Sequence, residues 1–102
     1  MLPSRERREA GIVMIMVDRP RFYTNSVLGR QWWCHMWTDG PAEELHAFAR
    51  RIGLRREWYQ EHHVLSHYDL TVCMRERALK EGAVLTDLRK YLAACRLPLE
   101  PS

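Results

Sequence analysis

The stretch QWWCHMWTDG, residues 31–40, determines the central element of this chain. Its apolar side chains form a run short enough for a buried strand rather than a long helix. Because side chains alternate along a strand, His35 shares one face with Trp33 and Trp37. Cys34 belongs to the opposite face, which we expect to pack into the core. The stretch therefore predicts a buried strand with one polar residue, His35, directed with Asp39 toward a site walled by tryptophans.

Other elements follow on both sides of this strand. The apolar run IVMIMVD predicts a second buried strand, and capping residues and glycines mark three helices. The segment after Asp18 contains Pro20, Asn25 and Gly29 and is typical of a loop. The expected elements are strands at 12–18, 32–39, 56–60 and 83–85, and helices at 40–53, 72–81 and 87–95, with loops at 19–30 and 61–66. This alternation predicts a compact α/β domain whose small, largely parallel sheet of three or four strands packs with about three helices.

Length and composition fit one ordinary globular domain of 102 residues, 46% of them hydrophobic. We expect the domain to span 12–96, preceded by a loose extension (1–11) and followed by a tail (97–102). No apolar run approaches the roughly 20 residues that cross a bilayer, which predicts a cytoplasmic protein without a membrane partner. The three cysteines are odd in number and lack C-x-x-C spacing, which argues against a disulfide framework.

The net charge of +3 is mild, but basic residues gather in two places, RERR (5–8) and RRIGLRR (50–56). Arginine clusters of this kind suit a small phosphorylated ligand or a nucleic acid. The second cluster also has a simpler explanation, because Arg50 and Arg51 end a predicted helix, where cations complement the helix dipole.

Polar residues collect near the predicted strand ends. In open α/β sheets, sites form outside the carboxyl ends of the strands, so these residues are candidates for one shared site. The candidate metal ligands are His35, Asp39, His46, His67 and Asp69, with Asp18 and Glu44 nearby.

Imidazoles combined with carboxylates are suitable ligands for a divalent metal such as zinc, manganese or iron. Without metal, the same residues form a His–Asp acid–base pair. In either case we expect His35, His67 and Asp69 to be catalytic. Tyr68, Arg21 and Arg56 are the expected substrate-binding residues.

Each candidate also has a purely structural explanation. Asp18 and Asp39 are of a type that often caps turns at strand ends. His35 fits a core histidine bonded to backbone, and His35-x3-Asp39 is a weak motif. The tryptophans are more often core residues than a base-stacking platform. His-Tyr-Asp at 67–69 is the segment that packing explains least.

Taken together, these segments resemble a small bacterial and phage family that is classed as a domain of unknown function. The resemblance runs from about Val13 to Leu92, and the segments that carry it are VDRP (17–20), CHMWTD (34–39), EELHAFARRIGL (43–54), HYDL (67–70) and GAV (82–84). The chain departs from the family pattern at Cys34, where serine is expected, at Phe22, where tryptophan is common, and at Ser66, where aspartate often stands. The residues that match the family pattern are Asp18, Pro20, His35, Asp39, Glu44, His46, Phe48, Gly53, His67, Tyr68 and Asp69. The resemblance supports the site residues among them, but it implies no activity.

Three functions remain open at this point. The first is a metal-assisted or His/Asp acid–base hydrolase acting on a phosphoester or nucleotide-like substrate, which requires His35, His46, His67 and Asp69 to lie within side-chain reach of one another. The second is a non-enzymatic nucleotide- or nucleic-acid-binding module. The third is a small interaction protein, such as a phage accessory factor, whose polar residues are structural. The first explains the most unusual residues.

Overall fold

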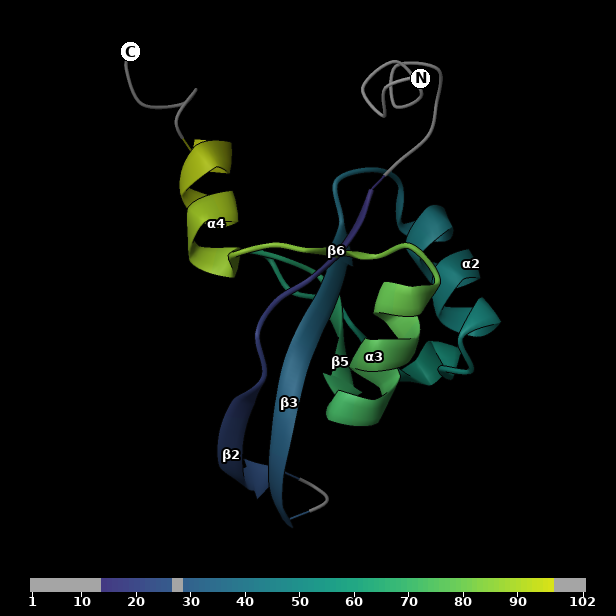
Figure 1. Ribbon diagram of the computed structural model, residues 1–102. Helices are drawn as coiled ribbons and strands as arrows, with labels where there is room; N and C mark the ends of the chain where they lie inside the picture. The colour runs from purple at the N-terminus through teal and green to yellow at the C-terminus, as the bar shows by residue number, and fades with distance from the viewer. Residues whose placement is uncertain (1–13, 27–28, 97–102) are drawn as a thin grey trace.

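A computed structural model describes residues 14–26 and 29–96, which form a six-stranded sheet and three α-helices (Figure 1). The expected extension at 1–11 and tail at 97–102 lie outside the described residues. The strands are β1 (Ile15–Val17), β2 (Arg21–Ser26), β3 (Gly29–Thr38), β4 (Tyr59–Gln60), β5 (His67–Thr71) and β6 (Val84–Leu85). The helices are α2 (Ala42–Arg51), α3 (Val72–Lys80) and α4 (Leu88–Arg96), with a short 3-10 helix, η1 (Arg56–Trp58). None of the helices among these residues has the length and apolar character needed to span a membrane.

The sheet is mostly antiparallel, with strand order β4-β5-β3-β1-β6 and β2 added beside β3. Among the strands of the described residues, β1 and β6 pair in parallel and the other four pairings are antiparallel. The expectation of a largely parallel sheet of three or four strands was therefore wrong. Two segments account for the difference: β2 was expected to be a loop, and β5 was expected only to lead into a helix.

The β2 segment combines opposing signals. Pro20 and Asn25 are typical of a loop, but Phe22, Tyr23 and Thr24 are residues that favour strands. Pairing with β3 decides the outcome: Arg21 lies opposite Trp33 and Phe22 opposite Trp32.

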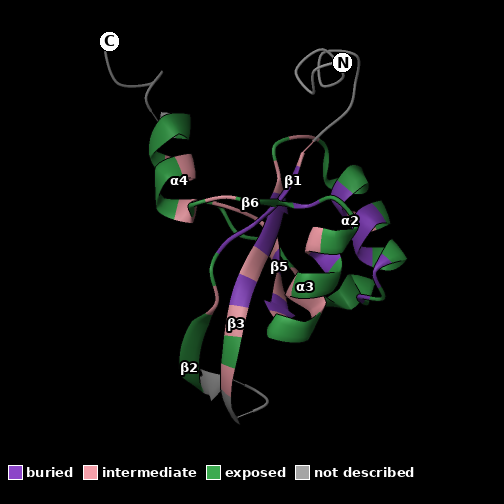
Figure 2. Cartoon of the chain, viewed as in Figure 1, coloured by how far each residue is buried: buried purple, intermediate pink, exposed green. Residues whose placement is uncertain are grey.

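β1 and β2 lie along the same edge of β3, separated by residues 18–20. Val17 is paired with Met36, and Arg21 is paired with Trp33. In Figure 1 the β2–β3 pair extends beyond α2 and α3 as a two-stranded arm. Figure 2 shows this arm as largely exposed along β2. The interruption at 18–20 is the point where the arm joins the body of the sheet.

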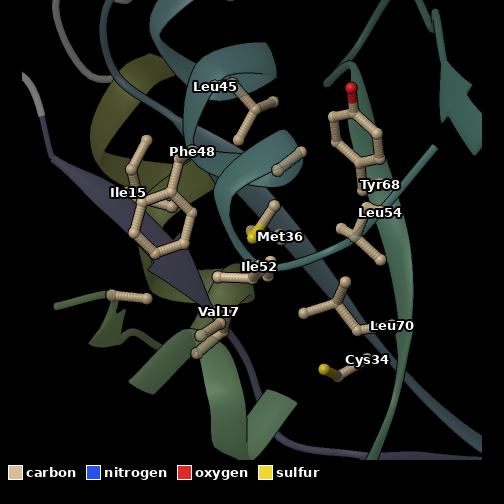
Figure 3. Close-up of a cluster of buried hydrophobic side chains, with 13 residues drawn as sticks. Ile15, Val17, Cys34, Met36, Leu45, Phe48, Ile52, Leu54, Tyr68 and Leu70 are labelled. Atoms are coloured by element: carbon tan, nitrogen blue, oxygen red, sulfur yellow. The ribbon is translucent and has the colours of Figure 1, made fainter. Parts of the chain in front are cut away.

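The helices α2 and α3 cover one face of the sheet and form the main core with it. The α2 helix begins with acidic residues in its first turn and ends with basic ones, which suits its dipole. Thr71 caps α3 as expected, its hydroxyl accepting from the Met74 N–H. The buried cluster contains Ile15, Val17, Cys34, Met36, Leu45, Phe48, Ala49, Ile52, Leu54, Tyr68, Leu70, Ala78 and Ala83, most of which are drawn in Figure 3.

The opposite face is partly covered by α4. Trp37 belongs to this face because it alternates with Met36, and its side chain is fully buried. Its ring lies 5.5 Å from that of Tyr91 in α4. His35 shares the face with Trp37, so the face opposite the main core carries the polar residue of the central strand.

Candidate metal centre

Three candidate residues converge on the sheet face opposite the main core. His35 in β3 lies directly across from Asp69 in β5, so both side chains point to the same face. His67 precedes Asp69 by two residues and therefore shares that face. His35, His67 and Asp69 each offer a ligand atom, and these three atoms lie within 4.8 Å of one another. We call these three residues the triad.

Asp18 fixes His35 at two points. One carboxylate oxygen accepts the backbone N–H of His35 at 2.7 Å, and the other accepts from the ring Nδ1 at 2.9 Å. The Asp18 backbone carbonyl is meanwhile occupied by Arg75 Nε at 3.0 Å. The Asp18 N–H still donates to the His35 carbonyl at 3.3 Å, so the side chain replaces only the second of the two ladder bonds in this row, between β1 and β2. Because a carboxylate only accepts, the proton of the ring bond is on Nδ1, and Nε2 of the neutral His35 ring carries a lone pair.

His67 has the same tautomer for a different reason. Its Nδ1 donates to the backbone carbonyl of Leu65 at 2.9 Å. Its Nε2 then faces Asp69 Oδ1 at 3.4 Å. Two acceptors facing each other repel, so a proton or a metal cation is required between them. The site is therefore built to hold positive charge.

The pKa values of His67 and Asp69 are both shifted by the contact between these two residues. The hydrogen bond with Asp69 raises the pKa of His67; burial opposes this, and the bond to Leu65 adds to it. Burial raises the pKa of Asp69, but the hydrogen bond and charge of His67, the charge of His35 and a bond from Gln60 together lower it below its usual value. Both shifts favour a negative carboxylate beside a cation.

Two imidazoles and one carboxylate on one face of a sheet are the residue types of the two-His-one-carboxylate arrangement of divalent metal sites. Metal-bound histidines usually donate their second ring N–H to a carboxylate or a carbonyl, as His35 and His67 do here. Ligand distances of about 2.1 Å would draw the three atoms slightly closer together. The side chain of Asp69 is 37% exposed, so water can reach the triad.

Residues 15–97 match the model of a family described as a protein of unknown function, DUF4031. The chain belongs to this family. The family resemblance expected from the sequence is thereby confirmed, and the triad lies inside the matched region. No curated protein and no solved structure matches the chain.

In this DUF4031 domain the remaining expected metal ligands lie elsewhere. His46 is on α2, on the core side of the sheet, where its Nδ1 lies 2.8 Å from the hydroxyl of Tyr68. Tyr68 alternates with His67 and Asp69, so it points to the core rather than to the triad (Figure 3). Asp39 lies beyond the end of β3, where its carboxylate accepts from the backbone N–H of Met14. Three of the four residues expected within reach of one another are together, and His46 is not.

The expected substrate-binding arginines are also divided between the two faces. Arg21 pairs with Trp33 and therefore shares the face of the triad. Arg56 lies in η1 with its guanidinium 5.1 Å from the centre of the Tyr59 ring, near His46. Glu44 is an exposed residue in the first turn of α2.

Sequence reasoning missed the groups that orient the triad. Asp18 was expected near the site without a role, and its bonds to His35 depend on a strand pairing that the sequence does not display. Gln60, whose amide donates to Asp69, was not a candidate. Its position opposite His67 in β4 is the signal that would identify it once the pairing is known. The Leu65 carbonyl is a backbone group and leaves no trace in the sequence.

Proposed function

We propose that this domain binds a divalent metal at His35, His67 and Asp69 and uses it to hydrolyse a phosphoester. The observation that carries the proposal is that Nδ1 of each histidine is bonded outside the triad, to Asp18 and to the Leu65 carbonyl, while the ligand atoms of the three residues lie within 4.8 Å of one another. Zinc, manganese and iron all accept this ligand set.

A metal held by three protein ligands keeps positions open for water and substrate, and lowers the pKa of a bound water to about 7. The protein residues provide the remainder: the triad holds the cation, Asp18 and the Leu65 carbonyl orient the two imidazoles, and the exposed part of Asp69 leaves the face accessible. In the net reaction the water oxygen bonds to phosphorus, the ester P–O bond breaks, and the alcohol leaves with a proton.

Arg21 supports a phosphorylated substrate over a neutral one. It is exposed and lies on the triad's face of the sheet, one cross-strand row away from His35. A guanidinium pairs with phosphate oxygens through two parallel hydrogen bonds, which would orient the ester toward the metal.

Elemental analysis of the untagged protein, loaded separately with zinc, manganese and iron and then desalted, tests metal binding. We expect near-stoichiometric metal in the parent protein and its loss in His35→Ala, His67→Ala and Asp69→Asn. His62→Ala is the matched control, because His62 is exposed in the loop before β5 and outside the triad. Retention of metal in His67→Ala, or its loss in His62→Ala, would contradict the site.

Hydrolysis is tested with the loaded protein and two chromogenic esters, p-nitrophenyl phosphate and bis(p-nitrophenyl) phosphate. Turnover that requires both the metal and His67 supports the proposed reaction. Stoichiometric metal without turnover of either ester would contradict the reaction while leaving the metal site in place.

A further inference from the structure

An aromatic and basic strip continues from the triad along the β2–β3 arm. Arg21 is paired with Trp33, and Tyr23 is paired with Gln31, in consecutive rows of the same sheet face. Trp33 precedes His35 by two residues, so its row is next to the row of His35 and Asp69. We call Arg21, Tyr23 and Trp33 the arm strip.

The strip lies in the direction in which a ligand at the triad can extend. Toward the other end of β3 the next residue on this face is Trp37, which is fully buried and packs against Tyr91 of α4. Toward the arm, Arg21 is exposed, Tyr23 is 39% exposed and Trp33 is partly exposed. A substrate longer than one phosphate group therefore finds α4 on one side and the arm strip on the other.

The spacing of the strip suits a chain of nucleotides. Residues two apart on a strand are separated by about 6.6 Å, so Trp33 and Tyr23 belong to neighbouring rows, and Arg21 lies opposite Trp33 in the first of these rows. Aromatic side chains stack on unpaired bases without regard to sequence, and arginine neutralises the backbone phosphates. A base can stack in this way only when it is not already within a duplex.

We infer, resting on the proposed function, that the substrate is a single-stranded nucleic acid lying along the arm strip, with a base on Trp33, a phosphate on Arg21 and the adjoining phosphodiester at the triad. Hydrolysis there breaks one P–O bond of the backbone and adds water across it, giving one phosphate end and one hydroxyl end.

The opposite face of the arm provides a matched control. Phe22 and Trp32 are a cross-strand pair of exposed rings 5.4 Å apart, and they point away from the triad. Trp32 and Trp33 are thus neighbours in sequence on different faces of the sheet. Arg56, exposed on the core side beside Tyr59, is the corresponding control for Arg21.

Fluorescence anisotropy with labelled oligothymidylate measures binding to the full chain. A metal chelator is present, so that differences in bound metal do not affect the measured affinity. We expect Trp33→Leu and Arg21→Gln each to weaken binding by about tenfold, and Trp32→Leu and Arg56→Gln to leave it nearly unchanged. Binding should also weaken as the salt concentration rises, and less steeply in Arg21→Gln. Thermal unfolding verifies that each variant is folded. Because Arg21 is exposed, we expect Arg21→Gln to fold, and this variant tests the inference even if Trp33→Leu unfolds.

The outcomes separate this inference from the proposed function. Suppose that the protein cleaves bis(p-nitrophenyl) phosphate in a metal-dependent way. If it does not bind oligothymidylate, or if Trp32→Leu and Trp33→Leu lose oligothymidylate affinity equally, the arm strip is not the binding surface and the metal hydrolase stands. Binding that depends on Trp33 in a protein that takes up no metal overturns the placement of a scissile bond at the triad. Tighter binding of a mononucleotide than of the oligomer overturns the single-strand assignment.

Discussion

The Asp18 carboxylate bonds to His35 twice, accepting once from the backbone N–H and once from the ring Nδ1 of His35. The Asp18 carboxylate is almost fully buried, whereas the His35 side chain is 22% exposed. The buried group thus orients the accessible one. A carboxylate behind a histidine in this way fixes the ring position and makes its other nitrogen a better metal ligand.

Asp18→Asn should therefore weaken metal binding without removing a ligand. An amide NH₂ directed at Nδ1 favours the tautomer with its proton on Nε2, which removes the lone pair from the site. We expect a loss of metal affinity of about 10- to 100-fold, measured by competition with a chromophoric chelator. Asp39→Asn, beyond the end of β3, is the control. Equal affinities for the parent and Asp18→Asn would exclude the orienting role.

The His46–Tyr68 pair should make stability depend on pH. Burial, assisted by the charge of Arg56, lowers the pKa of His46, so its protonation favours the unfolded state. Its contribution to the free energy of unfolding is complete above the ordinary pKa of about 6.5 and is lost as the pH falls through the lower folded value.

We expect the stability difference between the parent and His46→Gln to shrink from neutral to mildly acidic pH in urea unfolding. Tyr68→Phe removes the hydroxyl that bonds to Nδ1 and provides a companion measurement. A difference that grows as the pH falls would show that His46 is protonated in the folded protein.

The three cysteines should differ sharply in reactivity. Burial, followed by the charge of Asp18, raises the pKa of the Cys34 thiol to about 12, whereas Cys73 and Cys95 are exposed. Because the thiolate is the reactive form, a thiol reagent at neutral pH should modify Cys73 and Cys95 quickly and Cys34 only upon unfolding. Mass spectrometry of the labelled peptides identifies the modified positions. Rapid labelling of Cys34 in the folded protein would contradict its position in the core.

Leu70 should be among the most costly residues to truncate. It is fully buried in β5 beneath the helices. Leu70→Ala should lower the free energy of unfolding by about 2–5 kcal/mol, through lost burial and the cavity left behind. Leu85→Ala, at a residue 56% exposed in β6, should change it by no more than about 0.5 kcal/mol. Chemical denaturation of both variants makes the comparison, and similar losses would contradict the assignment of the core.

The sequence was sufficient to predict the parts of the fold that depend on local signals. Helices near 42–51, 72–80 and 88–96 follow from capping residues and apolar spacing. The alternation of Cys34 and His35 between core and site faces also follows from period two. The relative direction of the strands could not be predicted from local signals, because strand pairing is a long-range property. In addition, Pro20 and Asn25 indicated a loop where β2 forms.

The sequence predicted the three residues of the triad, but not where in the sheet they lie or which other candidates are separate from them. The rule that places sites at strand ends applies to parallel sheets, whereas the triad lies in the middle of an antiparallel sheet. Antiparallel pairing brings His35 opposite Asp69, and this register excludes Asp39, which lies four residues after His35, beyond the end of β3. His46 is a suitable ligand by residue type, but the sheet separates it from the triad, and only the three-dimensional structure shows this separation.

The alternation of His67, Tyr68 and Asp69 restricts how this segment can change in evolution. Inserting or deleting one residue within β5 would turn Tyr68 outward and direct two polar groups into an apolar core. A change of two residues would preserve the faces but separate Asp69 from His35. Length variation among homologues should therefore be confined to the preceding loop, residues 61–66, while the tripeptide is inherited as a unit.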